Sequence, residues 1–311
     1  MSAPHIPVLL SEVVATLAPE RGGVFIDGTL GFGGHAEAIL ARLPAGGRYI
    51  GIDRDGEALA AAAARLNPFS DRFTAVHGNF FHMKELLPPL GVEKADGILL
   101  DLGVSSYQLD TPERGFSYHL DAPLDMRMDR SEGPSAFDVV NGYPEEELAR
   151  ILREYGEERF AGRIANRIVT ARKTSAINST ARLAQIIKEA IPAKFRNEPQ
   201  HPARRTFQAV RIEVNGELFG LRQAVDDARD LLQTGGILCI IMFHSLEDRI
   251  VKQAFRSYEH PCTCPPSAPV CICGKTPTAR ILTKKPVTAS AEELERNPRA
   301  ASAKMRAIQR I

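Results

Sequence analysis

Acidic and glycine residues near the N-terminus have the types and spacing of a nucleotide-cofactor site. Gly31, Gly33 and Gly34 lie in one short turn, where glycines let the backbone approach a ligand closely and take positive φ values. Asp53 follows about twenty residues later, a position from which an acid can accept hydrogen bonds from both hydroxyls of a ribose. These residues predict a cofactor-binding turn, with a purely structural turn as the alternative.

The turn alone does not identify the cofactor. Residues 31–36 also satisfy the dinucleotide fingerprint with alanine in the last place, so a nicotinamide cofactor is one interpretation. Three residues favour S-adenosylmethionine instead. Asp27 directly precedes the turn, where a carboxylate could face a cationic amino group but would repel a pyrophosphate. Phe80 could stack on an adenine, and Asp101 opens a polar loop where methyltransferases of this fold present groups to the methyl acceptor.

The elements that must position these residues alternate between short apolar strands and helices. Strands are predicted at 24–27, 48–53, 73–77, 95–101 and 236–243, and helices at 35–43, 57–66, 81–87 and 221–232. Strands that are apolar throughout and alternate with helices indicate a parallel sheet covered on both faces. The expected fold class is therefore α/β, with a Rossmann-like S-adenosylmethionine methyltransferase sheet.

A long helical stretch interrupts this pattern. Residues 104–128 are loop-like, and helices are predicted at 145–155, 160–173, 180–190 and 203–219. The simplest organisation is one α/β domain with an inserted all-helical domain. The predicted boundaries are 1–108 for the first part of the methyltransferase domain, 109–216 for the helical insert, and 217–311 for the second part with a basic tail.

Positive charge is concentrated in residues 150–211, a stretch within the predicted insert. The whole chain has a formal net charge of +1, so a nucleic-acid partner would need a local basic surface. Residues 150–211 hold fourteen Lys or Arg and five Glu, a net charge of +9, which leaves −8 for the rest of the chain. This asymmetry favours docking of an RNA backbone on the insert over an ordinary solvated helical face. The basic tail, with Lys304, Arg306 and Arg310, could add phosphate contacts.

Four of the five cysteines fall within one short window. Cys262, Cys264, Cys271 and Cys273 could hold a structural zinc ion tetrahedrally. Their one-residue spacings are tighter than the usual two to four, so a loop of free thiols is the alternative. Residues 1–7 lack the basic start and apolar stretch of a secretory signal, and no apolar run is long enough to span a bilayer. The expected location is the cytoplasm, without a membrane partner.

Many stretches of the chain resemble the bacterial 16S ribosomal RNA cytosine-N4 methyltransferase family, known as RsmH or MraW. The matching stretches include 5–10, 27–35, 52–55, 99–106, 113–117, 123–129, 155–160, 205–212 and 243–249. The resemblance implies methylation of the exocyclic N4 of a decoding-centre cytosine in the 16S RNA of the small ribosomal subunit. It also implies cofactor contacts from Gly33, Gly34, His35, Asp53, Phe80, Asp101 and Gln108.

Candidate catalytic residues follow from the chemistry of that reaction. The amino nitrogen of cytosine is a poor nucleophile because its lone pair is delocalised into the ring. A group that accepts a hydrogen bond from this nitrogen can take up the positive charge that grows in the transition state. Asp101 and Ser105 follow the fourth strand and His244 follows the last long strand, so all three are candidates. The alternatives are that Asp101 only contacts the cofactor or caps a loop, that Ser105 is a turn residue, and that His244 is a structural histidine.

Other functions are compatible with parts of the sequence. A methyltransferase of the same fold could act on DNA or another small substrate. A nicotinamide oxidoreductase would explain the glycine turn, but not Asp27 or the loop that follows Asp101. A non-catalytic ribosome-assembly factor could keep a decayed pocket, although the intact acids Asp27, Asp53 and Asp101 argue against decay.

Overall fold

The chain divides into two compact units. The computed structural model describes residues 6–196, 200–265 and 270–311. One unit comprises Met1–Gly103 with Leu218–Ile311, and is called the sheet unit below. The other comprises Val104–Glu217 and is called the helical insert. The predicted insert, 109–216, lies inside this second unit.

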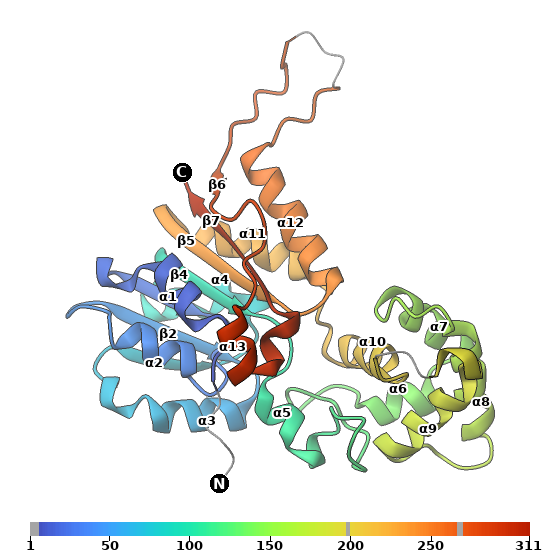
Figure 1. The fold of residues 1–311 in the computed structure, drawn as a ribbon. Coiled ribbons are helices and arrows are strands. Elements are labelled where there is room, and N and C mark those ends of the chain that lie inside the picture. The colour runs from blue at the N-terminus through green and yellow to red at the C-terminus, as the bar shows by residue number, and fades with distance from the viewer. Residues whose placement is uncertain (1–5, 197–199, 266–269) are drawn as a thin grey trace. The chain divides into compact units, whose positions relative to one another are not determined.

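A seven-stranded sheet forms the centre of the sheet unit, with strand order β3-β2-β1-β4-β5-β7-β6 (Figure 1). The strands are β1 (Val24–Asp27), β2 (Arg48–Asp53), β3 (Phe73–His77), β4 (Ala95–Asp101), β5 (Leu232–Met242), β6 (Ala279–Ile281) and β7 (Lys304–Arg310). Strands β1 to β5 pair in parallel, whereas β7 is antiparallel to both β5 and β6. The predicted Rossmann-like α/β sheet is confirmed.

Helices cover both faces of this sheet. The helices of the sheet unit are α1 (Leu10–Leu17), α2 (Gly34–Leu40), α3 (Gly56–Arg65), α4 (Met83–Leu86), α11 (Leu221–Leu231), α12 (Ser245–Glu259) and α13 (Ala291–Arg296). Phe25 and Tyr49 pack in one buried cluster with α1 and α2, while their neighbours Ile26 and Ile50 pack in another with α11 and α12. Alternate residues of each strand therefore enter opposite cores, which explains why the strands are apolar throughout.

The C-terminal segment corrects one expectation. Residues 304–310 form β7 inside the sheet rather than a separate tail, and contact of its basic residues with phosphates stays a prediction. Met305, Ala307 and Ile308 are buried, and Arg306 is only 7% exposed because it pairs with Asp248 at 2.6 Å. Charged residues lie among the apolar residues of β7, so the hydrophobic pattern of the sequence did not predict a strand here.

The helical insert has its own core. Its helices are α5 (Ser106–Asp110), α6 (Ala136–Gly142), α7 (Glu145–Glu154), α8 (Ala161–Arg172), α9 (Thr180–Ala190) and α10 (Arg204–Asn215). Fully buried Leu148, Ile164 and Leu183 pack together in one cluster, from three of these helices. Among its described residues the only strand-type pairing is one isolated bridge, so the prediction of a helical insert is confirmed. Within the described ranges of the whole chain, no helix has the length and hydropathy needed to cross a membrane.

Candidate active site

Three acids end three neighbouring strands of the sheet. Asp27 ends β1, Asp53 ends β2 and Asp101 ends β4, and β1 lies between the other two strands. Because parallel strands present their carboxyl ends at one edge, the three side chains meet at the same edge of the sheet. The structure thus brings together the acids that the sequence singled out.

Asp27 is the most enclosed of the three. It is 1% exposed, and its carboxylate accepts hydrogen bonds from the Tyr49 hydroxyl at 3.0 Å and the Thr29 amide at 3.0 Å. Burial raises the pKa of Asp27 to about 7 despite these two hydrogen bonds. A cation brought to this carboxylate would therefore stabilise its ionised form.

Asp53 joins the glycine turn to the end of β2. Its carboxylate accepts a hydrogen bond from the Gly31 amide at 2.7 Å and another from the Asp55 amide at 2.8 Å. Burial raises the pKa of Asp53, against the effect of these two bonds. Asp55 in turn caps α3 by accepting from the amides of its first turn. The acid is thus held in place by backbone on both sides.

Thr29 links the other two acids and was missed by the sequence analysis. Its hydroxyl accepts a hydrogen bond from the Asp101 amide at 2.6 Å and lies 3.4 Å from an Asp27 oxygen, to which it can donate. A threonine two residues after an acid is a recognisable turn signal. Tyr49, by contrast, lies within β2 and carries no signal of its contact with Asp27.

Asp101 has a carboxylate oxygen with no partner. Among the described residues, its Oδ1 is buried and has no hydrogen bond. Burial raises the pKa of Asp101 well above its usual range, and the negative charges of Asp27 and Glu247 raise it further. Such an orphaned acceptor fits a ligand that brings an N–H group or a positive charge.

His35 lies beside Asp101. Its Nδ1 is 3.9 Å from Asp101 Oδ2, and its Nε2 is 2.9 Å from the Val8 carbonyl oxygen. Because that carbonyl can only accept, Nε2 carries the proton, and in the neutral ring Nδ1 is the unprotonated nitrogen. The ring therefore presents an acceptor on the side of Asp101.

The glycines in and beside the turn differ in whether packing requires a residue without a side chain. A Cβ on Gly28 would lie 2.5 Å from Leu100 and 2.9 Å from Phe80, so this glycine lets the chain pass these two side chains. A Cβ on Gly34 would lie 2.4 Å from Pro7. At Gly31, where φ is +52°, a Cβ would meet only a backbone oxygen at 3.9 Å. Open space therefore borders the turn at Gly31, whereas packing requires glycine at the other two positions.

Two predicted site residues of the insert, Ser105 and Gln108, form hydrogen bonds with one another. Ser105 Oγ accepts from the Gln108 amide at 3.2 Å, and Gln108 Oε1 accepts from the Ser105 amide at 3.0 Å. This capping box starts α5, and it buries Gln108 to 4% exposure. Elsewhere in the insert, Arg127 donates two 3.0 Å hydrogen bonds to the carboxylate of Asp125, an ion pair within one loop.

His244 has the contacts of a helix cap. Its Nδ1 accepts from the Glu247 amide at 3.4 Å at the start of α12, and its Nε2 lies 3.2 Å from Glu247 Oε1. The Glu247 carboxylate also accepts from the Phe243 amide at 2.9 Å. Asp248, one residue further, pairs with Arg306. The Nδ1 contact agrees with the structural alternative stated for His244, whereas its buried Nε2 makes no hydrogen bond among the described residues, so the catalytic role stays a prediction.

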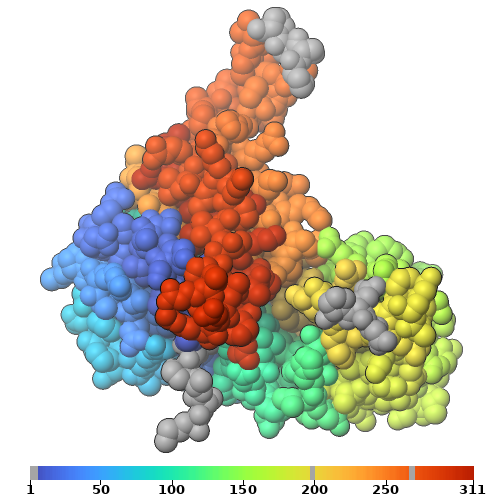
Figure 2. All heavy atoms as spheres, in the orientation of Figure 1, coloured from blue at the N-terminus to red at the C-terminus, as the bar shows by residue number. Residues whose placement is uncertain are grey.

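The insert has both paired and exposed basic residues. Arg150, Arg167 and Arg211 form ion pairs with glutamates of the insert. Arg163 and Lys188 are exposed on α8 and α9. The surface of this unit is drawn from green to yellow in Figure 2. Exposed cations are the ones that can reach a phosphate backbone, so the effective charge of this surface is smaller than the sequence count.

The chain has a full-length match among known families. The model of the MraW methylase family matches residues 2–311. The chain belongs to the MraW methylase family. The match includes both the sheet unit and the insert, so the acids at the sheet edge and the basic helices are both parts of an MraW methylase.

Relatives of this MraW methylase carry the name "Ribosomal RNA small subunit methyltransferase H". The one from Symbiobacterium thermophilum is 55% identical, over 100% of this chain and 98% of its own length. Those from Lachnospira eligens and Clostridium botulinum (strain Kyoto) are 52% and 53% identical, over 100% of this chain and 99% and 100% of their own lengths. A solved putative rRNA-methylase from Clostridium thermocellum has a TM-score of 0.45 at 11% identity, over 99% of this chain and 100% of that one.

Proposed function

We propose that this protein transfers the methyl group of S-adenosylmethionine to the exocyclic N4 of a decoding-centre cytosine in 16S RNA of the small ribosomal subunit. The observation that carries the proposal is the full-length match to ribosomal RNA small subunit methyltransferases at up to 55% identity. The acids at the sheet edge support the cofactor, and the basic insert supports the RNA. We infer a cytoplasmic location, where bacterial ribosomal subunits are assembled.

Negative charge at the sheet edge favours a cationic cofactor. Burial raises the pKa of Asp27, Asp53 and Asp101, so each would gain from a nearby positive charge. The amino group and sulfonium of S-adenosylmethionine are cationic, whereas the pyrophosphate of a dinucleotide would meet like charge. This comparison favours S-adenosylmethionine over the nicotinamide alternative.

The cofactor would be held by the turn and the strand ends. Asp53 would accept hydrogen bonds from the ribose hydroxyls, and Phe80 would contact the adenine. The full proposed set is Gly33, Gly34, His35, Asp53, Phe80, Asp101 and Gln108. When bound, S-adenosylmethionine supplies an electrophilic methyl group on sulfur.

Asp101 is the proposed acceptor for the amino group of cytosine. Its buried Oδ1 would accept a hydrogen bond from an N4–H group, which localises the nitrogen lone pair for attack on the methyl carbon. As the new N–C bond forms and the bond between methyl and sulfur breaks, the nitrogen loses one proton. Asp101 would take this proton and pass it to water. A cationic cofactor beside Asp101 would counter the effect of burial and favour the ionised carboxylate, which is the form that can accept the proton.

Ser105 and His244 are proposed to act through position. Ser105 caps α5, and the loop from Asp101 leads directly into this helix. His244 caps α12, which follows the carboxyl end of β5. Each cap fixes a chain segment that leaves the carboxyl edge of the sheet, and this role requires no contact with the reacting atoms.

The insert is the proposed RNA-binding surface. A base in a folded RNA must be unstacked before its amino group can be methylated. Exposed arginines and lysines of the insert would bind the backbone around that base and hold it in place. The positive charge favours a nucleic acid but does not separate RNA from DNA, which the following experiment does.

A transfer assay tests the proposal. Small ribosomal subunits and naked 16S RNA from a strain without the endogenous enzyme would be incubated with labelled S-adenosylmethionine, beside double-stranded DNA. We expect label at N4 of one cytosine of 16S RNA and none in DNA, with a reaction that lacks the protein as the control. Transfer to DNA alone, or no transfer to any form of the subunit RNA, would contradict the proposal.

A further inference from the structure

The connection between α12 and β6 holds four cysteines. Its described residues, 260–265 and 270–278, are called the cysteine arm and extend away from the sheet (Figure 1). Of its described residues, 260–265 and 270–278, none is buried and none lies in a helix or strand. Val270 and Ile272 are 70% and 86% exposed. Hydrophobic packing therefore cannot explain why the four thiols converge.

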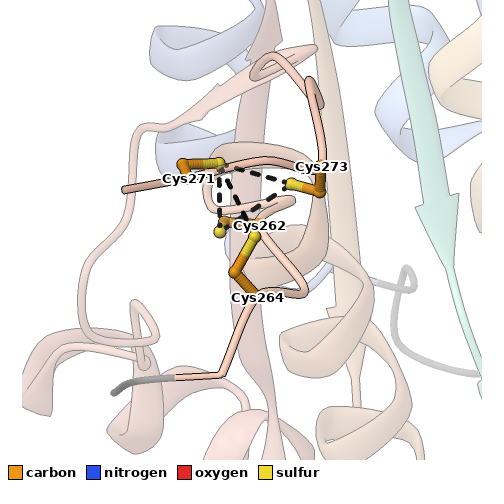
Figure 3. Close-up of side chains that lie close together, drawn as sticks. All are labelled: Cys262, Cys264, Cys271 and Cys273. Carbon is orange, nitrogen blue, oxygen red and sulfur yellow. Dashed lines mark hydrogen bonds between the residues drawn. The ribbon is translucent and has the colours of Figure 1, made fainter. Parts of the chain in front are cut away.

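The sulfur atoms have the spacing of a tetrahedral metal site (Figure 3). Cys262 Sγ lies 3.6 Å from Cys271 Sγ and 3.8 Å from Cys273 Sγ. Cys271 Sγ lies 3.9 Å from Cys264 Sγ and 3.5 Å from Cys273 Sγ. With zinc–sulfur bonds of about 2.3 Å, the edges of a regular tetrahedron are about 3.8 Å long.

The same distances exclude disulfides in this structure. A disulfide joins two sulfurs at about 2.0 Å, and it would pair the thiols two by two. Here Cys271 Sγ lies within 4 Å of three other sulfurs, and all four lie within 4.8 Å of one another. The thiols therefore surround one common point, as metal ligands do.

A backbone hydrogen bond supports this arrangement. The Ile272 amide donates to Cys264 Sγ at 3.4 Å. Amide donors of this kind orient and stabilise thiolate ligands in metal sites. The thiols are also reachable, because Cys262 and Cys271 are exposed and the other two are partly exposed.

We propose that the cysteine arm binds one Zn²⁺ through Cys262, Cys264, Cys271 and Cys273. Four soft thiolates in a tetrahedron favour zinc over hard cations, and they leave no open position for substrate, so the site is structural. Binding releases the thiol protons to solvent. The ion takes the place of a hydrophobic core in the arm, because a short segment without buried apolar residues is not stable in one conformation by itself. This inference is independent of the proposed methyl transfer.

The full-length protein, purified under reducing conditions, provides the test. Elemental analysis should find about one zinc per chain. Cobalt exchanged for zinc should give the thiolate charge-transfer and visible bands of a tetrahedral sulfur site. A thiol reagent should modify four more cysteines after chelation than before, and trypsin should cut faster after the exposed Lys275. Protein with no zinc whose four thiols react equally without a chelator would overturn the proposal, as would bound iron.

A double variant locates the ion. Cys262→Ser with Cys271→Ser should reduce bound zinc at least tenfold, whereas Thr263→Ala, in the same arm, should keep it. Cys239→Ala should also keep it, since Cys239 is buried in β5. Zinc retained by the double variant would overturn the assignment to the arm. The chelation experiment on the unaltered chain decides the question even if the double variant does not fold.

Discussion

The sheet unit and the helical insert place charge in opposite ways. The sheet unit gathers carboxylates at one edge, and burial raises the pKa of Asp27, Asp53 and Asp101 there. In the insert, burial alone would raise the pKa of Asp125, but hydrogen bonds and the charge of Arg127 lower it. In the sheet unit these three acids are buried with raised pKa values, whereas the insert has exposed cations such as Arg163 and Lys188 within the basic stretch 150–211. Buried acids suit a cationic cofactor, and exposed cations suit a polyanion.

The largest effect is expected from the acid proposed to touch the substrate. Asp101→Asn removes the negative charge but keeps the shape, and should lower the single-turnover rate of methyl transfer by about 10²–10⁴-fold. Cofactor affinity, measured separately, should change much less. Asp71→Asn, at an exposed site before β3, is the control and should be fully active. A loss smaller than tenfold in Asp101→Asn would leave Asp101 with a role in cofactor binding alone.

The next effect concerns stability without cofactor. The pKa of Asp27 is about 7 in the folded protein and 3.8 when unperturbed. Below pH 4 the carboxyl group is neutral in the folded protein, and its contribution to stability is fully present. This contribution is lost as the pH rises towards 7. Three pKa units correspond to about 4 kcal/mol, so Asp27→Asn should gain up to about 4 kcal/mol relative to wild type between pH 4 and pH 8.

Denaturant unfolding at several pH values measures this difference. Asp125→Asn in the insert is the matched control. Its folded pKa is lowered, so its stabilising effect is present above pH 4 and is lost only at lower pH. The difference between this control and wild type should therefore be flat from pH 5 to pH 8. A flat difference for Asp27→Asn as well would show that Asp27 is ionised in the folded protein at ordinary pH.

A smaller effect is expected at the ribose position. Asp53→Ala removes a charged acceptor and should weaken S-adenosylmethionine binding by between about 10-fold and 100-fold, as measured by calorimetry. The neighbouring acid offers a control, because Asp55→Asn keeps the cap of α3. Equal loss in both variants would indicate damage to the turn rather than a lost ribose contact.

The smallest effect is expected from single charges of the insert. Arg163→Ala, Lys173→Ala and Lys188→Ala remove exposed cations, and together should weaken RNA binding about tenfold. Each should also reduce the slope of log affinity against log salt by about one. Cofactor affinity should not change. Lys252→Ala on α12 of the sheet unit is the control, and an equal loss there would remove the distinction between the two units.

Local sequence patterns were sufficient to predict the site residues that lie at the ends of strands. Strands β1 to β4 were predicted with the bounds observed, because each is a short apolar run between turn signals. Asp27, Asp53 and Asp101 could be found for the same reason, since each directly ends such a run. The four clustered cysteines likewise needed only their spacing to be noticed. Whether Asp101, Ser105 and His244 act in catalysis stays a prediction.

Contacts between distant parts of the chain decided the rest. Only the paired strands show that Tyr49 meets Asp27, that Thr29 connects Asp27 to Asp101, and that one Asp101 oxygen has no partner among the described residues. The sequence alone determined strands β1 to β4, the three acids and the concentration of positive charge in residues 150–211, because these depend on residues near one another in the chain. The tertiary structure decided the burial of each charge, because desolvation depends on every element packed around it.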